Sequence, residues 1–144
     1  MSTQLVNPIK NGTIRKSDKW GEGAFGAARG SRKHNGLDIS ATNGQDILSP
    51  INGKVTRKSF PYANDLSYTG IVIKGTGVHA TISIKIFYMT PLASVIGSDV
   101  IAGEKTGIAQ DLTRKYPGMT NHIHLEVKKN NSLVDPKSML PGII

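Results

Sequence analysis

Short β-branched runs separated by turn residues dominate this sequence, and almost no segment repeats apolar residues with the period of an amphipathic helix. The chain has 16 Gly and 7 Pro in 144 residues, and these residues punctuate the apolar runs. The clearest run spans residues 80–89, where Ile82, Ile84 and Ile86 alternate with polar residues. Such alternation places one face of a strand in a core and the other toward solvent. The sequence therefore predicts an all-β fold.

Eight short segments combine β-branched residues with flanking turn residues and are predicted to be strands. They are residues 12–17, 37–40, 46–48, 54–60, 70–75, 81–89, 105–109 and 122–128. The segment 75–79 is expected to connect two of these strands as a hairpin, with His79 solvated at its tip. Residues 97–103 are expected to form a Gly-rich turn between short strands. One helical turn is predicted after Asp135, an N-cap residue followed by proline at the first helical position.

The length predicts a single domain, residues 1–144, that is large enough to form a core without crosslinks. Within it, the less regular residues 1–33 are expected to wrap as an extension on a motif-bearing core, residues 34–140. The chain has no cysteine. Disulfides and thiolate metal sites are therefore excluded, which fits folding in a reducing compartment.

The charge balance of 18 Lys and Arg against 10 Asp and Glu gives a net charge of +8. Nucleic acid, an anionic membrane or an anionic cell-wall polymer would suit such a charge. The basic residues are dispersed in pairs, such as Arg15-Lys16, and form no basic helix or long run of like charge. We expect either a generally solvated basic surface or one attracted to a polyanionic envelope. Nucleic acid is the least supported of the three partners, because the sequence contains no nucleic-acid recognition motif.

Three of the chain's four histidines lie in two short motifs, His34-Asn-Gly-Leu-Asp38 and His122-Ile-His124. Imidazole nitrogens and a carboxylate oxygen are the ligands of catalytic zinc sites, in which three protein ligands leave one position open for water. A histidine that is not a ligand would be available as a general base. The two motifs together indicate a zinc hydrolase.

The spacing within each motif constrains these roles. On a strand, His122 and His124 would point to the same face about 6.5–7 Å apart, which suits one ligand beside one base better than two ligands of one ion. His34 and Asp38 would lie about 13 Å apart on a straight strand. A tight turn at Asn35-Gly36 can bring them together. The competing interpretation is a polar His-X-His strand without a metal, because each motif alone is a weak signal.

The ordered motifs resemble those of the lysostaphin/LytM-type zinc endopeptidases. Besides the histidine motifs, the matching segments are residues 44–55, 97–107 and 134–140. Residues 85–92 and 116–124 are most similar to the leukocyte cell-derived chemotaxin 2 branch of that family. The resemblance implies open antiparallel sheets with long Gly-rich loops and minimal helix. It also implies one Zn²⁺ per chain, bound by His34, Asp38 and His124, with His122 as the catalytic histidine.

The chain departs from the family pattern at one position. The peptidases carry a further histidine after a Tyr-X pair, where it stabilises the oxyanion, whereas Tyr88-Met89 is followed here by Thr90. The chemotaxin branch also lacks this histidine and is regarded as zinc-binding rather than peptidolytic. Thr90 or Tyr88 is expected to donate a weaker hydrogen bond to the oxyanion. Glu126, on the same strand face as the histidines, would either orient one of them or be solvated.

The expected function is that of a zinc-dependent peptidoglycan endopeptidase that hydrolyses peptide crosslinks of the bacterial cell wall. A lysin, a virion-associated lysin and an antibacterial effector all fit this expectation. The alternative is a non-catalytic, zinc-stabilised binding module. Bacterial peptidoglycan is the expected partner. We expect the protein to be a monomer without a transmembrane segment. The sequence shows no Sec signal peptide, so we expect synthesis in the cytoplasm and action at the cell wall or periplasm after release, delivery or lysis.

Overall fold

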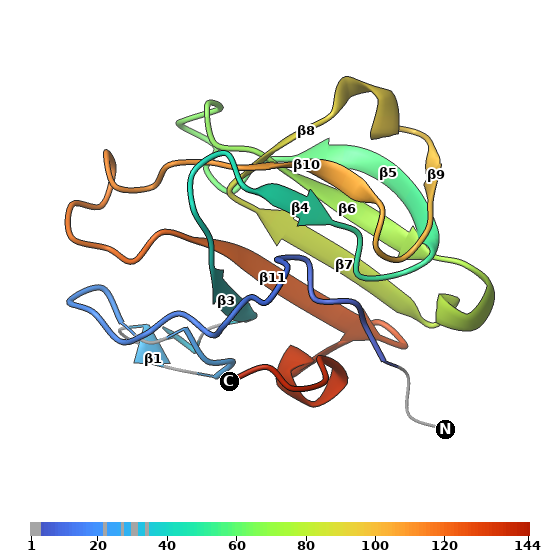
Figure 1. Ribbon diagram of the computed structural model, residues 1–144, viewed down its shortest axis with the longest axis horizontal. Coiled ribbons are helices and arrows are strands. Elements are labelled where there is room, and N and C mark those ends of the chain that lie inside the picture. The colour runs from blue at the N-terminus through green and yellow to red at the C-terminus, as the bar shows by residue number, and fades with distance from the viewer. Residues whose placement is uncertain (1–3, 22, 27, 30–31, 34) are drawn as a thin grey trace.

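The computed structural model describes residues 4–21, 23–26, 28–29, 32–33 and 35–144, and these residues form antiparallel β-sheets (Figure 1). Their helical structure is limited to three short 3₁₀ turns. These are η1 (Gly77–His79), η2 (Ala93–Val95) and η3 (Pro136–Met139). The all-β prediction is confirmed. No helix in the described part of the chain is long and apolar enough to cross a membrane.

The largest sheet has seven strands in the described residues and carries both motif strands. Its main path runs in the order β12-β11-β7-β6-β5-β9, and β3 pairs with β11 beside that path. The strands are β3 (Leu37–Ser40), β5 (Gly53–Ser59), β6 (Gly70–Gly75), β7 (Ile82–Phe87), β9 (Asp99–Val100), β11 (His122–Lys129) and β12 (Ser132–Val134). The pairing of β6 with β7 confirms the predicted hairpin.

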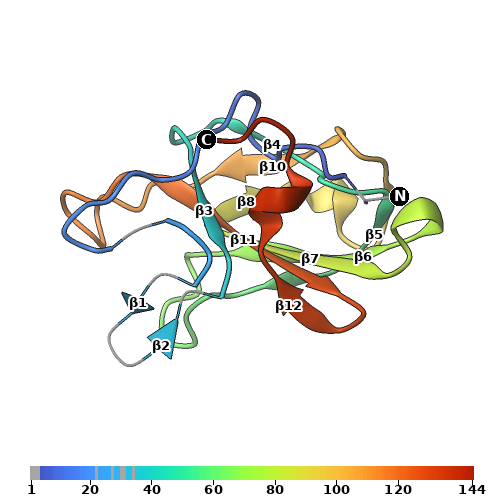
Figure 2. The same ribbon diagram turned by 90° about the horizontal axis from the view of Figure 1, so that it is seen from below.

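A small sheet lies on one side of the large one, as Figure 2 shows. It contains β4 (Asp46–Leu48), β8 (Met89–Pro91) and β10 (Lys105–Ala109), in the order β4-β10-β8. Each sheet contributes one apolar face, so the hydrophobic core forms largely between them. Core side chains include Ile47, Ile71, Ile84, Ile86 and Met89. The opposite face of the large sheet can therefore carry polar side chains.

The long strand predicted over residues 81–89 is divided at Tyr88. Tyr88 has a φ of 71°, in the left-handed region that non-glycine residues rarely occupy. The chain turns there from β7 in the large sheet to β8 in the small sheet. Strand periodicity alone did not show this break, because the alternation of apolar and polar residues approaches it without a glycine or proline.

The prediction of a strand over residues 12–17 is wrong. Only Ile14 pairs there, in an isolated bridge to Ile39 of β3. Gly12 lies so close to Ile39 that an added Cβ would be 2.7 Å from its side chain, and Arg15 is buried rather than alternating toward solvent. Later in the N-terminal region, β1 (Ala28–Arg29) pairs with β2 (Arg32–Lys33). The sequence had not indicated this pairing.

The prediction that His79 is solvated is also wrong. His79 ends η1 and is only 7% exposed. Its Nδ1 accepts a hydrogen bond of 2.9 Å from the backbone N–H of Asn52. This histidine therefore joins the β6–β7 connection to the residue before β5, which explains its burial without a metal or a catalytic role.

Candidate metal centre

Strand β11 brings His122 and His124 to one face of the large sheet. Ile123, Leu125 and Val127 are fully buried on the other face, so the alternation of the strand fixes the direction of both histidines. His122 is 3% exposed, and the side chain of His124 is 13% exposed. The apolar residues that alternate with the polar ones along β11 thus anchor the strand and hold both imidazoles in place.

Strand β3 places Asp38 against these histidines. In the antiparallel pairing of the two strands, Asp38 is the partner of His124, and Ser40 is the partner of His122. Asp38 Oδ1 lies 3.0 Å from His124 Nδ1, and Asp38 Oδ2 lies 3.5 Å from His122 Nε2. The structure therefore gathers three of the four residues predicted for the site. The fourth, His34, lies outside the described residues.

Gly36 explains part of the spacing of the first motif. A Cβ at this position would overlap the backbone carbonyl of Leu125 and come within 2.9 Å of the His124 ring. Residue 36 must therefore be glycine for the chain to pass this close to β11. Gly36 belongs to the Asn35-Gly36 step, where the sequence allows a tight turn, and it lies directly against Leu125 and His124.

The donor atoms fit a zinc ion at this place. Ligand bonds of about 2.1 Å at a tetrahedral angle put two donors about 3.4 Å apart. The 3.0 Å separation of Asp38 Oδ1 and His124 Nδ1 needs only a small adjustment to meet that value. The described residues contain no group of three or more candidate ligands for one ion, so a complete set requires a donor outside them or from solvent.

Glu126 lies beside the second histidine and is not a freely solvated side chain. Its Oε1 is 3.9 Å from His124 Nε2, and its Oε2 is 3.7 Å from Lys85 Nζ. A carboxylate facing Nε2 favours the proton on that nitrogen and leaves Nδ1 toward Asp38, as expected for a metal-binding histidine. Phe87 stacks on the same ring, with the two ring centroids 6.0 Å apart. These contacts fix the orientation of His124.

The two histidines differ in their protonation. Burial lowers the pKa of His122, and the charge of Asp38 only partly opposes this shift. Burial also acts to lower the pKa of His124, but hydrogen bonds to Asp38 and Glu126 outweigh it and raise the pKa to about 9. His122 is therefore neutral at physiological pH. A metal ion bound at His124 Nδ1 would replace a proton.

The hydrogen bond of His122 defines which nitrogen can act as a base. Its Nδ1 lies 2.8 Å from the carbonyl oxygen of Thr120, which can only accept, so Nδ1 is assigned the proton. The lone pair of the neutral ring is then on Nε2, the nitrogen that faces Asp38. This is the arrangement required of a general base next to a metal ligand.

Tyr88, the strained residue between β7 and β8, stands next to His122. Their rings are perpendicular, with centroids 5.6 Å apart. The Tyr62 hydroxyl shares hydrogen bonds with the hydroxyls of Tyr88 and Tyr116. Burial raises the pKa of Tyr88 to about 12, so its hydroxyl keeps its proton and can donate. Strained residues that the fold holds in place are frequent at functional sites.

Thr90, the other predicted donor, has different surroundings. It is exposed on β8, and its hydroxyl accepts a hydrogen bond of 3.3 Å from Gln110 Nε2. In the small sheet it pairs with Ile108 of β10. The structure thus brings Tyr88 into contact with a histidine of the site, while the hydrogen bond of Thr90 is directed to Gln110.

Arg15 is a site residue that the sequence did not reveal. The sequence predicts a surface position for the pair Arg15-Lys16, either solvated or attracted to a polyanionic envelope. Arg15 is instead only 4% exposed, and its Nη1 lies 2.6 Å from Asp38 Oδ2. Its Nη2 also contacts Asp18 Oδ1 at 3.0 Å. Burial raises the pKa of Asp18, but hydrogen bonds from Arg15 and from backbone N–H groups outweigh it and lower the pKa to about 2. Asp18 is therefore a charged carboxylate partner of Arg15.

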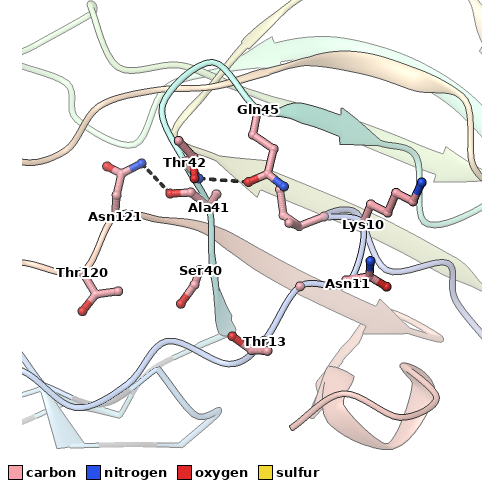
Figure 3. A pocket seen from close by; sticks show the side chains of 11 residues that line it. Lys10, Asn11, Thr13, Ser40, Ala41, Thr42, Gln45, Thr120 and Asn121 are labelled. Carbon is pink, nitrogen blue, oxygen red and sulfur yellow. Dashed lines mark hydrogen bonds between the residues drawn. The ribbon is translucent and has the colours of Figure 1, made fainter.

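A polar pocket of about 330 Å³ lies near the site, where the end of β3 meets the N-terminal segment and the residues before β11 (Figure 3). The hydrogen bonds in its wall include one from Asn121 Nδ2 to the Ala41 carbonyl and one from the Thr42 N–H to Gln45 Oε1. Hydroxyl and amide side chains and Lys10 make it hydrophilic. Its lining contains none of Asp38, His122 and His124, so it lies beside the candidate metal centre.

Comparisons with known proteins agree with this geometry. The model of Peptidase family M23 matches residues 32–136. Leukocyte cell-derived chemotaxin-2 of Mus musculus is 33% identical over 97% of this chain and 92% of its own length. A zinc-containing peptidase from Vibrio cholerae has a TM-score of 0.62 at 23% identity, over 90% of this chain and 37% of that chain.

Lysostaphin has a TM-score of 0.64 at 14% identity, over 93% of this chain and 57% of that chain. These likenesses to solved structures concern the fold, and this chain spans only 37% and 57% of those two solved chains. They confirm the predicted open antiparallel fold of the lysostaphin type. Because the family model covers both histidine motifs and most of the chain, this chain belongs to peptidase family M23.

Proposed function

We propose that this protein is a zinc-dependent endopeptidase that hydrolyses peptide crosslinks of bacterial peptidoglycan. The observation that carries the proposal is the convergence of Asp38, His124 and a neutral His122 on one face of the large sheet. Family membership supports peptidase chemistry in general. The zinc-containing peptidase among the structural neighbours supports the choice of metal.

In this proposal Asp38 and His124 hold the metal together with His34. A zinc ion there would act as a Lewis acid on the scissile carbonyl and lower the pKa of water toward ~7. His122 Nε2 would accept a proton from the attacking water and return it to the leaving amine nitrogen. The Thr120 carbonyl keeps the ring in the orientation and tautomer that this transfer needs.

Tyr88 is the residue we assign to the developing oxyanion. Its hydroxyl remains protonated, and its ring contacts His122, so a substrate carbonyl near His122 would lie near it. A preorganised donor at a developing negative charge contributes about 10²–10³ in rate. This role would compensate in part for the family histidine that Thr90 replaces.

Peptidoglycan as the substrate rests on the net charge of +8 and on the family. An anionic wall polymer attracts a cationic protein, and such attraction raises the encounter rate. We therefore place its action at the cell wall or periplasm, as a monomer. Incubating the zinc-loaded protein with purified sacculi and analysing released muropeptides by mass spectrometry tests the proposal. Cleaved crosslinks in wild type, absent with H122A, are the expected result.

A second candidate function is a zinc-stabilised binding module that does not cleave. It is favoured by Thr90 in place of the family histidine and by the similarity to leukocyte cell-derived chemotaxin-2, which is named as a chemotaxin. Under this alternative, zinc-loaded protein would be retained by sacculi or another ligand while the muropeptide profile stays unchanged.

A further inference from the structure

Arg15 lies outside both histidine motifs, on the N-terminal segment that runs along β3. Main-chain contacts fix its place: the Arg15 N–H donates to the Asp38 carbonyl at 2.9 Å, and the Asp38 N–H donates to the Gly23 carbonyl at 2.8 Å. A Cβ at Gly23 would come within 2.7 Å of the Arg15 Cβ, so the two chain segments pack tightly. The guanidinium is therefore held against Asp38 by backbone as well as side chain.

The guanidinium joins two carboxylates. Nη1 donates to Asp38 Oδ2 at 2.6 Å, while Nη2 and Nε donate to the two oxygens of Asp18 at 3.0 and 3.3 Å. Nη2 also donates to the Gly21 carbonyl at 2.9 Å. Planar fork geometry of this kind cannot be reproduced by a lysine ammonium, which offers a single point charge.

Asp18 extends the network to the catalytic histidine. Its Oδ2 accepts the backbone N–H of Thr120 at 2.9 Å, and the Thr120 carbonyl accepts the Nδ1 proton of His122 at 2.8 Å. One continuous path of polar contacts thus runs from Asp38 through Arg15, Asp18 and Thr120 to His122. The path holds both the candidate ligand and the candidate base.

The two oxygens of Asp38 consequently face different partners. Oδ2 accepts a hydrogen bond from Arg15 and lies 3.5 Å from His122 Nε2, whereas Oδ1 faces His124 Nδ1 at 3.0 Å. We propose that Arg15 is a positioning residue of the metal site, which reserves Asp38 Oδ1 as a single-oxygen ligand and, through Asp18 and Thr120, sets the orientation of His122. This inference rests on the proposed metal site and adds to it a residue outside the motifs.

The test is metal binding by the purified full chain, measured by competition with a chromophoric chelator, in wild type, R15Q, R15K and D18N. Loss of an outer-shell partner typically lowers metal affinity 10- to 100-fold. We expect a loss in this range for R15Q, a smaller loss for D18N, and incomplete rescue in R15K. R57Q is the control, because Arg57 is an exposed arginine of β5, and its affinity should equal that of wild type.

A spectroscopic readout separates positioning from general stabilisation. With Co²⁺ as the probe, the visible absorption reports the number of ligands, since geometry depends on the donor set. If Arg15 reserves one oxygen, R15Q lets both Asp38 oxygens approach the ion, and the visible band loses intensity. A wild-type spectrum together with wild-type affinity in R15Q overturns the inference.

R15Q can fail to fold, because it removes the cation beside the buried carboxylate of Asp38. Circular dichroism identifies that case, and R15K, which keeps the charge, then decides. A wild-type Co²⁺ spectrum and affinity in folded R15K would show that charge alone suffices, which refutes the positioning role. Failure of wild type itself to bind one ion per chain would instead refute the proposed function, so the two failures are distinguishable.

Discussion

The carboxylate of Asp38 and the imidazole of His124 face each other across two paired strands, with Oδ1 and Nδ1 3.0 Å apart. The register of β3 against β11 sets this distance, and the buried Ile39 and Ile123 on the opposite face fix the register. A one-residue slip of β3 would turn Asp38 to the opposite face of the sheet, away from His124. The candidate metal centre is therefore built into the pairing of the sheet rather than into a loop alone.

Zinc content is the first prediction. We expect one zinc ion per wild-type chain and loss of zinc in H124A, because this change removes Nδ1 from the pair of donors. Elemental analysis after mild purification measures the content. H79N is the control, since an asparagine oxygen can replace His79 Nδ1 as acceptor for the Asn52 N–H. Equal zinc content in H124A and wild type would contradict the assigned site.

His122 should be needed for hydrolysis but not for the metal. We expect H122A to keep its zinc and to lose about 10²–10⁴-fold in rate, the usual contribution of a general base. Parallel measurement of zinc content and of muropeptide release from sacculi separates the two functions. Loss of zinc in this variant would mean that His122 is a ligand and that the roles of the two histidines are exchanged.

The hydroxyl of Tyr88 is the subject of the third prediction. Y88F removes only that hydroxyl, and we expect the rate of hydrolysis to fall about 10²–10³-fold with unchanged zinc affinity. T90V is the matched control, because it removes a hydroxyl at nearly constant volume from a residue whose hydrogen bond goes to Gln110. If T90V loses activity and Y88F does not, Thr90 is the donor.

Several features of the fold were predictable because they depend on local pattern. The apolar residues at Ile82, Ile84 and Ile86 identified the central strand, and the His-X-His spacing placed two histidines on one strand face. The burial of Arg15 was not predictable, because its partners Asp18 and Asp38 are recognisable only once the N-terminal segment lies along β3. Its place in the basic pair Arg15-Lys16 indicated a surface position for the Arg15 side chain instead.

The break at Tyr88 and the burial of His79 escaped prediction for a related reason. Neither residue carries a local signal: a tyrosine with positive φ lacks the glycine that usually marks such a turn, and His79 is held by Asn52, 27 residues away. Non-local contacts decide both cases. The same limit applies to β12, whose short run became a strand by pairing with β11.

Retention by cell walls should depend on salt. A protein with a net charge of +8 is attracted to an anionic polymer, and the range of this attraction falls from about 10 Å at 0.1 M to about 3 Å at 1 M ionic strength. We expect less protein to sediment with sacculi at high salt than at low salt. Retention that does not change with salt would indicate recognition by specific contacts instead of net charge.

The last prediction concerns Gly36, whose missing side chain lets the chain approach β11. An alanine Cβ there would overlap the Leu125 carbonyl and touch the His124 ring, and a backbone carbonyl within a sheet cannot move aside cheaply. We expect G36A to displace the ring from Asp38, to lower zinc affinity at least tenfold, and to lower the melting temperature.

G44A is the control, because Gly44 has a φ of 83° and open space around its Cβ direction. It should cost about 1 kcal/mol of stability through backbone strain and leave zinc affinity unchanged. Chelator competition measures the affinity, and thermal unfolding with and without zinc measures the stability. If G36A binds zinc as tightly as G44A, the close packing of residue 36 on His124 is not required for the metal centre.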